Sequence, residues 1–200
     1  LSYMLMGSKQ IKNQTGNETI IMSNLKESTL LSSQAFKGKL LDVRLDEVLL
    51  PNNTKSTREW IKHPGGVCII PLFPNNEIGL INQYRYPVRK ELIELPAGKI
   101  DKNEEPEQTA LRELEEEIGY KAKKLTFLTE MYPAVGFASE RMIYFIAENL
   151  VKTQTCLDSD EFVDFFTLKV STALEMVWSG KIKDGKTIIG LLWLSRYLEN

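Results

Sequence analysis

The stretch Gly98-Lys-Ile-Asp-Lys-Asn-Glu104 is followed, after seven intervening residues, by Arg112-Glu-Leu-Glu-Glu-Glu-Ile-Gly119. The second part predicts a helix over Pro106–Ile118, because proline is favoured in the first turn of a helix and a glycine such as Gly119 commonly ends one. Strand-like segments precede and follow this helix. The sequence therefore predicts an α+β protein with a mixed sheet and helices packed on it.

The predicted helix carries two kinds of side chain on different sectors. At about 100° per residue, one stripe is apolar and would face the core: Leu111, Leu114 and Ile118. Another edge carries three carboxylates: Glu113, Glu116 and Glu117. Residues 91–120 have a net charge of −7, while the rest of the chain has +5. The total charge of −2 thus conceals a concentrated acidic segment.

Like charges spaced three and four residues apart destabilise a helix by about 0.2–0.5 kcal/mol per pair. A hard divalent cation such as Mg²⁺ or Mn²⁺ would reverse this effect, because it takes oxygen ligands and also binds phosphate. The alternative is a solvent-exposed acidic helix face, which is the commoner state of a Glu-rich helix.

The rest of the composition excludes several functions. His63 is the one histidine, and two cysteines are too few for a structural zinc site, so metal chemistry would have to rest on carboxylates. We interpret His63 as structural. The small net charge argues against nucleic-acid binding, and the chain has no apolar stretch long enough to span a membrane. Cysteine usage is typical of a reducing compartment, so we expect a cytoplasmic protein.

The stretch over residues 98–120 resembles the Nudix box, the signature of hydrolases that act on a nucleoside diphosphate linked to another group. Tyr120 is the one departure, since the family prefers an aliphatic residue there. The resemblance implies the Nudix fold, a mixed β-sheet sandwiched between helices. It also implies two or three Mg²⁺ (or Mn²⁺) ions per site. The implied metal ligands are Glu113, Glu117, Glu116 and the Ala97 carbonyl.

Two more roles follow from the same resemblance. Arg112 would orient a glutamate of the cluster, and Gly98 would let the backbone approach metal and phosphate. Glu104 would tie the loop to the helix. The resemblance places Glu116 and Arg112 in the catalytic machinery together with a general base.

Outside the box, most of residues 36–198 resembles the ADP-ribose pyrophosphatase branch of the family, through Gln83–Pro87, Glu94–Asp101 and Asp160–Asp164. The implied base is Glu161, in an acidic loop, with Asp158 and Asp160 as alternatives. The implied substrate-binding residues are Arg58, Glu59, Trp60, Arg85, Ala97, Gly98, Gly136 and Glu140. Trp60 would stack on adenine, although it also suits an ordinary core or interface position.

The chain divides into three expected parts. Residues 1–33 resemble a mobile leader or tag-like arm, residues 34–63 form a β-hairpin that the resemblance makes a dimerisation unit, and residues 64–200 form the hydrolase domain. The hairpin strands would lie at 41–46 and 56–61. Further strands are expected at 67–72, 79–84, 92–95, 125–129, 142–147 and 162–168, and two further helices at 171–179 and 186–198.

The function expected from the resemblance is Mg²⁺-dependent hydrolysis of ADP-ribose, giving AMP and a sugar phosphate, by a homodimer with exchanged N-terminal strands. The segment Pro133–Glu140 departs from the branch pattern, which leaves GDP-mannose or another nucleoside diphosphate sugar as an alternative. A protein that binds ADP-ribose for regulation, without catalysis, is the alternative from another class.

Overall fold

The computed structural model describes residues 9–12, 19–22, 24–157, 159 and 161–199. Asp158 and Asp160, the alternative bases, lie outside the described residues. The chain divides between Lys62 and His63 into two compact units.

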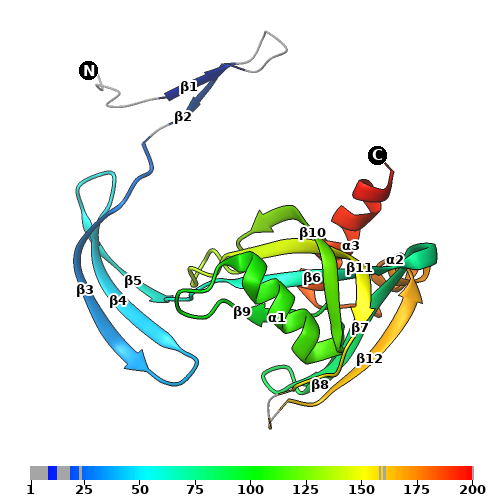
Figure 1. The fold of residues 1–200 in the computed structure, drawn as a ribbon. Coiled ribbons are helices and arrows are strands. Elements are labelled where there is room, and N and C mark those ends of the chain that lie inside the picture. Colours follow the sequence, from blue (N-terminus) through cyan, green and yellow to red (C-terminus); the bar gives the residue numbers. More distant parts are fainter. Residues whose placement is uncertain (1–8, 13–18, 23, 158, 160, 200) are drawn as a thin grey trace. The chain divides into compact units, whose positions relative to one another are not determined.

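The N-terminal unit consists of antiparallel strands (Figure 1). Strands β1 (Lys9–Lys12) and β2 (Thr19–Met22) pair with each other. Strands β3 (Ser28–Lys37), β4 (Asp42–Leu49) and β5 (Lys55–Ile61) form a second sheet in that order.

The expected hairpin is present as β4 and β5, and β3 adds a third strand that begins within residues 1–33. Every residue of β3 is exposed, so this strand has none of the apolar alternation by which a half-buried strand is recognised.

The second unit is built on a mixed sheet of seven strands among the described residues, with the central order β10-β11-β6-β7-β12. Strand β8 pairs with β7, and β9 pairs with β6. Among these pairs, β6 and β11 are parallel and the others are antiparallel. The strands are β6 (Gly66–Phe73), β7 (Glu77–Arg85), β8 (Lys90–Glu94), β9 (Ala97–Lys99), β10 (Tyr120–Met131), β11 (Met142–Lys152) and β12 (Val163–Lys169). A short 3₁₀ turn, Pro74–Asn76, joins β6 to β7.

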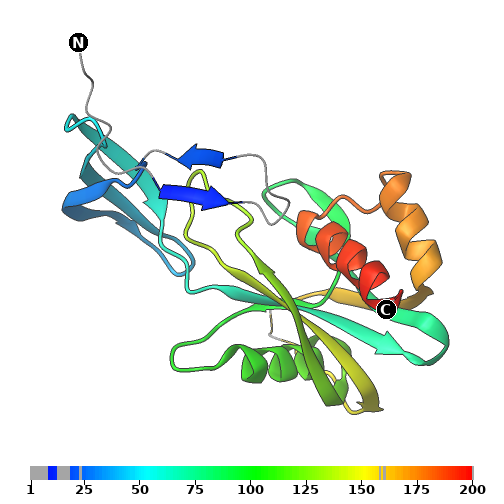
Figure 2. The same ribbon diagram turned by 90° about the horizontal axis from the view of Figure 1, so that it is seen from above.

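Helices cover both faces of this sheet, as Figure 2 shows. Helix α1 (Pro106–Ile118) packs on one face, against the apolar side chains Val67, Ile69, Ile81, Ile143 and Phe145. Helices α2 (Val170–Trp178) and α3 (Gly185–Leu198) pack on the other, against Cys68, Ile70, Leu80, Tyr144 and Ile146. Successive residues of β6 point to opposite faces of the sheet, and helices cover both faces. Strand β6 is therefore apolar almost throughout. The fold is α+β, with the sheet between helices, as predicted.

Helix α1 has the predicted bounds and the predicted C-terminal cap. Glu105 and Gln108 form a reciprocal capping box at its start, and Gly119 ends it in the left-handed conformation, with φ of 69°. The predicted apolar stripe was partly wrong, because Leu111 is 40% exposed and Ala110 takes the core position. Tyr120 begins β10 and packs edge-on against Phe73, with ring centroids 5.1 Å apart. The aromatic residue is thus accommodated by a local aromatic contact.

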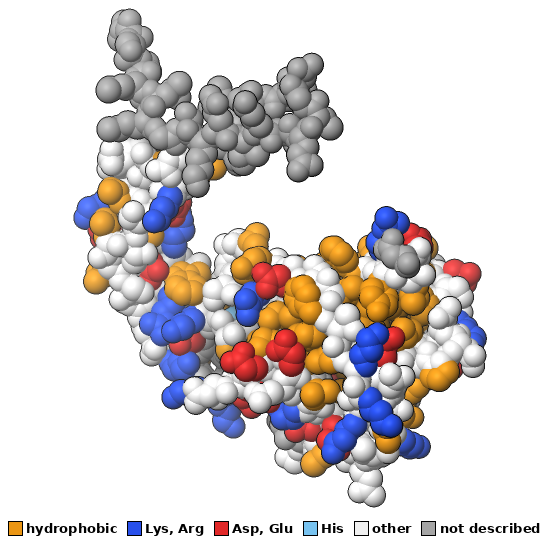
Figure 3. Space-filling model, turned by 45° about the horizontal axis from the view of Figure 1, so that its top comes forward, with side chains coloured by type: hydrophobic (Ala, Val, Ile, Leu, Met, Phe, Trp, Pro, Cys, Tyr) orange, Lys and Arg blue, Asp and Glu red, His pale blue; other side chains and the backbone are white. Residues whose placement is uncertain are grey.

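Hydrophobic side chains are also exposed, and Figure 3 shows them beside charged side chains on one face of the protein. No helix within the described ranges is both long enough and apolar enough to cross a lipid bilayer.

Candidate active site on helix α1

Two glutamates of helix α1 lie beneath the segment that forms β9, Glu117 buried and Glu113 half-buried. Glu117 is 5% exposed, and its Oε2 atom accepts a hydrogen bond of 3.1 Å from the backbone N–H of Ala97. Glu113 lies one turn earlier, directly against Gly98: a Cβ atom on Gly98 would stand 1.9 Å from the Glu113 carboxyl carbon. The absence of a side chain at Gly98 is therefore what allows the backbone to lie on this carboxylate.

Burial and mutual repulsion shape the electrostatics of this pair. Burial, followed by the charge of Glu113, raises the pKa of Glu117 to about 8. Burial also raises the pKa of Glu113, against the opposing effect of Arg112. Glu161 adds repulsion to both carboxylates. A site that raises the pKa of two neighbouring acids in this way favours either a proton or a bound cation.

Arg112 joins the acidic residues around the helix. Its Nε and Nη2 atoms each donate a 3.0 Å hydrogen bond to Glu104, and Nη1 donates to Glu113 and Glu116 at 2.8 Å. Glu104 also accepts a 2.8 Å bond from Thr109 Oγ1, so it ties the loop to the helix as expected. The hydrogen bonds from Arg112 are the main reason why the pKa of Glu104 falls to about 2.

The candidate ligands suit a hard cation, because they are carboxylate oxygens. The backbone at Gly98 lies so close to Glu113 that a Cβ atom there would collide with the carboxylate. Within the part of the chain that the structure describes, no three acidic, histidine or cysteine side chains converge on one point. Nη1 of Arg112 bonds to both Glu113 and Glu116, and Ala97 turns its N–H toward Glu117. The assignment of Glu113, Glu116, Glu117 and the Ala97 carbonyl as metal ligands therefore stays a prediction.

A cleft of about 220 Å³ opens beside Ala97 and Gly98. Four of the expected substrate-binding residues line it together: Arg85, Ala97, Gly98 and Glu140. Its other lining residues are His63, Gly66, Lys99, Met142 and Lys186. The lining of the cleft thus includes the cationic side chains of Arg85, Lys99 and Lys186. It also includes the backbone at Ala97 and Gly98, which contacts Glu117 and Glu113.

Two cations of this cleft, Arg85 and Lys186, are held by carboxylates that are buried or half-buried. Glu94, 1% exposed, accepts two hydrogen bonds from Arg85, at 2.8 Å and 2.7 Å, and also contacts Lys186 Nζ. Lys186 Nζ lies 3.0 Å from Asp184. Burial lowers the pKa of Lys186, but Asp184 and Glu94 outweigh it and raise the pKa overall, so this lysine keeps its charge.

Sequence reasoning missed Lys186, and it assigned His63 a purely structural role. Asp184-Gly185-Lys186 marks a helix start, but nothing local to it shows that Lys186 meets Glu94, which is 92 positions away. The Nδ1 atom of His63 accepts from the Gly65 N–H at 3.1 Å, and its Nε2 atom lies 4.0 Å from Glu140 Oε1. His63 therefore turns its second nitrogen toward an expected substrate-binding residue.

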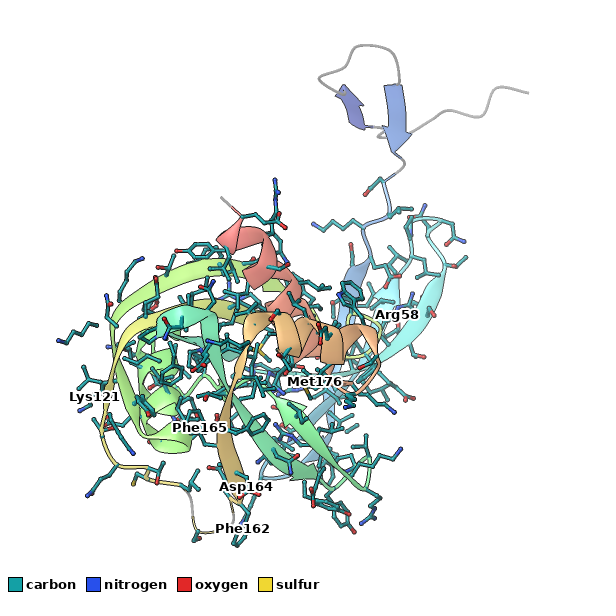
Figure 4. The ribbon with its side chains drawn as sticks, turned by 90° about the vertical axis from the view of Figure 1, so that its right-hand side faces the viewer. Arg58, Lys121, Phe162, Asp164, Phe165 and Met176 are labelled. Atoms are coloured by element: carbon teal, nitrogen blue, oxygen red, sulfur yellow. The ribbon has the colours of Figure 1, made fainter. Side chains whose placement is uncertain are left out.

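Glu161 lies at the end of the loop before β12. It lines a second cavity, of about 320 Å³, with Asn82, Tyr84, Glu91, Leu157, Phe162, Val163 and Asp164. Phe162 is 80% exposed, and Figure 4 shows Phe162 and Asp164 at the start of β12. Electrostatically, Glu161 is near enough to raise the pKa of Glu113 and Glu117.

The other expected substrate-binding residues are Arg58, Glu59, Trp60 and Gly136. Arg58, Glu59 and Trp60 lie on β5, in the N-terminal unit. Arg58 is ion-paired with Glu27, and the Trp60 indole N–H donates to Asp46 at 2.9 Å. Gly136 belongs to an exposed turn; within the described residues, the space beside its Cα is open. The structure leaves the substrate-binding roles of these residues as predictions.

A larger cavity, of about 450 Å³, also borders α1. It is lined by Leu111, Arg112, Glu115, Glu116, Lys121, Ala122, Gln154 and Cys156. The backbone that contacts Glu117 and Glu113, at Ala97 and Gly98, lines the smaller cleft and not this cavity, and so does the cation pair Arg85 and Lys186. We therefore assign the smaller cleft as the candidate active site.

Comparison with known proteins gives consistent matches. The NUDIX domain family model matches residues 62–183. The chain is 43% identical over 175 residues to an ADP-ribose pyrophosphatase of Bacillus subtilis, covering 86% of this chain and 95% of the relative. It is 40% identical to a methanol dehydrogenase activator of Bacillus methanolicus, covering 84% and 92%, and 35% identical to a GDP-mannose pyrophosphatase of Yersinia enterocolitica, covering 62% and 70%. A crystal structure of an ADP compounds hydrolase has a TM-score of 0.80 at 21% identity, covering 89% of this chain and 97% of the other.

Proposed function

The chain belongs to the Nudix family and is a Nudix pyrophosphatase, and on this premise we propose that it hydrolyses ADP-ribose to AMP and ribose 5-phosphate. The coarser activity, hydrolysis of a nucleoside diphosphate sugar, is supported by relatives named as ADP-ribose and GDP-mannose pyrophosphatases. The higher identity and fuller coverage of the Bacillus subtilis relative favour ADP-ribose.

One observation carries the proposal: cationic side chains line a small cleft whose backbone lining, at Ala97 and Gly98, contacts two glutamates of α1. Glu113 and Glu117 lie beneath Ala97 and Gly98, while Arg85 and Lys186 line the opening itself. A diphosphate is the ligand that needs both, because its oxygens bind divalent cations and also accept hydrogen bonds from guanidinium and ammonium groups.

Bound Mg²⁺ or Mn²⁺, as two or three ions, would polarise the phosphoryl oxygens and lower the pKa of the attacking water. Glu113, Glu116, Glu117 and the Ala97 carbonyl would hold these ions. Arg112, already bonded to Glu113 and Glu116, would set the orientation of those carboxylates.

Glu161 is the proposed general base. It would accept the proton of the water that attacks phosphorus, while the P–O bond to the leaving phosphate breaks. Its repulsion, which raises the pKa of both Glu113 and Glu117, supports this assignment. Arg85 and Lys186 would bind the diphosphate, and Gly98 and Glu140 would contact the adjoining ribose and phosphate.

For the nucleoside, we propose adenine stacked on Trp60, with Arg58 and Glu59 beside it and Gly136 in the turn that borders the sugar. These roles need a homodimer in which N-terminal strands are exchanged, so that one subunit completes the site of the other. A reducing, cytoplasmic location is consistent with the free thiols of Cys68 and Cys156.

The decisive experiment assays ADP-ribose, ADP-glucose, GDP-mannose and NADH with Mg²⁺ or Mn²⁺, measuring phosphate released by a coupled phosphatase. The proposal expects ADP-ribose to have the highest kcat/KM, and Glu117→Gln to reduce turnover by at least about a hundredfold with an unchanged fold. Preference for GDP-mannose would replace the substrate assignment. Tight ADP-ribose binding without hydrolysis of any compound would indicate a regulatory binding protein instead.

A further inference from the structure

Residues 95–97, where the chain enters β9, are held by three different elements. Toward α1, the Ala97 N–H donates to Glu117 at 3.1 Å. Toward α3, the Leu95 N–H donates to the hydroxyl oxygen of Thr187 at 2.8 Å, across 92 positions of sequence. Between them, the Pro96 carbonyl accepts a 2.8 Å bond from the Ile69 N–H. Three consecutive residues are therefore each fixed by a different element.

The direction of the Thr187 hydroxyl is fully determined. Thr187 is 0% exposed, and its Oγ1 atom lies 2.7 Å from Asp184 Oδ2, an atom that can only accept from it. The hydroxyl hydrogen is thus committed to Asp184, and an oxygen lone pair is left for the Leu95 N–H. Asp184 is fixed in turn by the Thr187 N–H at 2.9 Å and by Lys186.

The next turn of α3 reinforces this contact. A Cβ atom on Gly190 would stand 2.6 Å from Leu95 Cδ1, so the helix backbone lies directly against the fully buried Leu95 side chain. Gly190 follows Thr187 by three positions, and both therefore lie on the helix face toward Leu95. The start of α3 thus packs on Leu95 and also hydrogen-bonds its backbone.

We infer that Thr187 is a positioning residue for the active site: its hydroxyl sets the backbone of residues 95–98 and, through it, the affinity for the divalent cation. The inference rests on the proposed function, because it concerns the same metal site. Among the described residues, Thr187 forms its side-chain hydrogen bonds with Leu95 and Asp184 and not with Glu113 or Glu117. Helix α3 would therefore act on the metal site through the backbone of residues 95–98.

The test compares Thr187→Val, which keeps the shape and removes the hydroxyl, with Thr187→Ser, which keeps the hydroxyl. Mn²⁺ affinity is measured on the full chain by electron paramagnetic resonance, without substrate. We expect about a tenfold weaker affinity in Thr187→Val and near wild-type affinity in Thr187→Ser, in line with other residues that orient metal ligands indirectly. Leu194→Ala, a buried substitution on the same helix, controls for lost stability and should bind Mn²⁺ normally when folded.

A second measurement needs no variant to fold. In the metal-free wild type, the amide hydrogens of Leu95 and Ala97 should exchange as slowly as those of the core strand β6. Fast exchange at Leu95 would overturn the inference, as would unchanged Mn²⁺ affinity in folded Thr187→Val. A wild-type chain that binds no Mn²⁺ would overturn the proposed function, and the inference with it, so the two failures are distinguishable.

Discussion

The backbone N–H of Ala97 donates to the Glu117 carboxylate over 3.1 Å, and this bond fastens the start of β9 to helix α1. Two adjacent features of the Nudix box, a glycine-containing loop and a glutamate-rich helix, meet at this point. The bond also turns one oxygen of a buried acid toward the loop, and Glu113 lies next to it beneath Gly98. Several consequences of this arrangement can be measured.

Glu117 should make the metal-free protein less stable as the pH rises. The folded pKa of about 8 lies above the ordinary value of 4.5, so the folded state holds the extra proton between these values. Stability should therefore fall from about pH 4.5 to about pH 8, by at most about 1.4 kcal/mol per pH unit from this group. Urea denaturation in EDTA across this range should show the slope in the wild type and a flatter profile in Glu117→Gln.

Mg²⁺ should offset this loss. At pH 8 it should raise the melting temperature of the wild type more than that of Glu117→Gln, because a ligand that binds only the folded state stabilises it. Equal pH profiles for the two proteins would show that Glu117 is ionised normally in the folded state.

Gly98→Ala should impair the site through a steric clash. The added Cβ atom would stand 1.9 Å from the Glu113 carboxyl carbon, so β9 or the glutamate has to move. We expect a loss of about 1–3 kcal/mol in stability and at least about a tenfold lower kcat. Gly185→Ala is the matched control, because the space beside Gly185 is open and alanine is favourable at a helix start. Wild-type activity in Gly98→Ala would contradict the close approach.

Catalysis should depend on the shape of the Arg112 side chain as well as on its charge. Lysine keeps the charge but cannot bond to Glu104 with two nitrogens and to Glu113 and Glu116 with a third. Arg112→Lys should lower kcat by about tenfold or more. In a double-mutant cycle with Glu104→Gln, the two changes should couple by about 0.5–3 kcal/mol in stability. Additive effects would show that the two side chains act independently.

The local parts of this site could be predicted from sequence, and the distant parts could not. The bounds of α1 could be predicted because Pro106 is its first residue and Gly119 directly follows its last. The meeting of Glu94 with Lys186, and of Leu95 with Thr187, joins residues 92 positions apart through the packing of α3 on the sheet. Neither pair has a spacing pattern that a single sequence displays.

Two other features were hidden for different physical reasons. Strand β3 is exposed along its whole length, so no alternation of apolar and polar residues marks it. Leu111 has the right spacing for the apolar stripe, but it is 40% exposed, and Ala110 lies in the core instead. A small residue such as Ala110 carries a weak hydrophobic signal although it is fully buried.

Lys186 should contribute to substrate binding. Lys186→Met keeps the apolar stem and removes the ammonium that lines the cleft beside Arg85. KM for ADP-ribose should rise by about tenfold or more, since a charged hydrogen bond contributes about 1.5–3 kcal/mol. Lys183→Met, at an exposed position three residues earlier, should leave KM unchanged. A fall in melting temperature with an unchanged KM would restrict Lys186 to a structural role beside Glu94.

Substitutions of Trp60 test whether the N-terminal unit takes part in nucleotide recognition. Its indole N–H donates to Asp46 at 2.9 Å, so a purely structural role is a real alternative. Stacking on adenine needs the ring alone, whereas the structural role needs the N–H. Trp60→Phe should therefore keep most of the affinity for ADP-ribose, and Trp60→Leu should raise KM by about five- to a hundredfold, the equivalent of about 1–3 kcal/mol. Asp46→Asn is the matched control, because it weakens the indole bond and leaves the ring in place. If Trp60→Leu and Trp60→Phe gave the same KM as the wild type while all three variants lost stability, Trp60 would serve the sheet of β3, β4 and β5 and not the substrate.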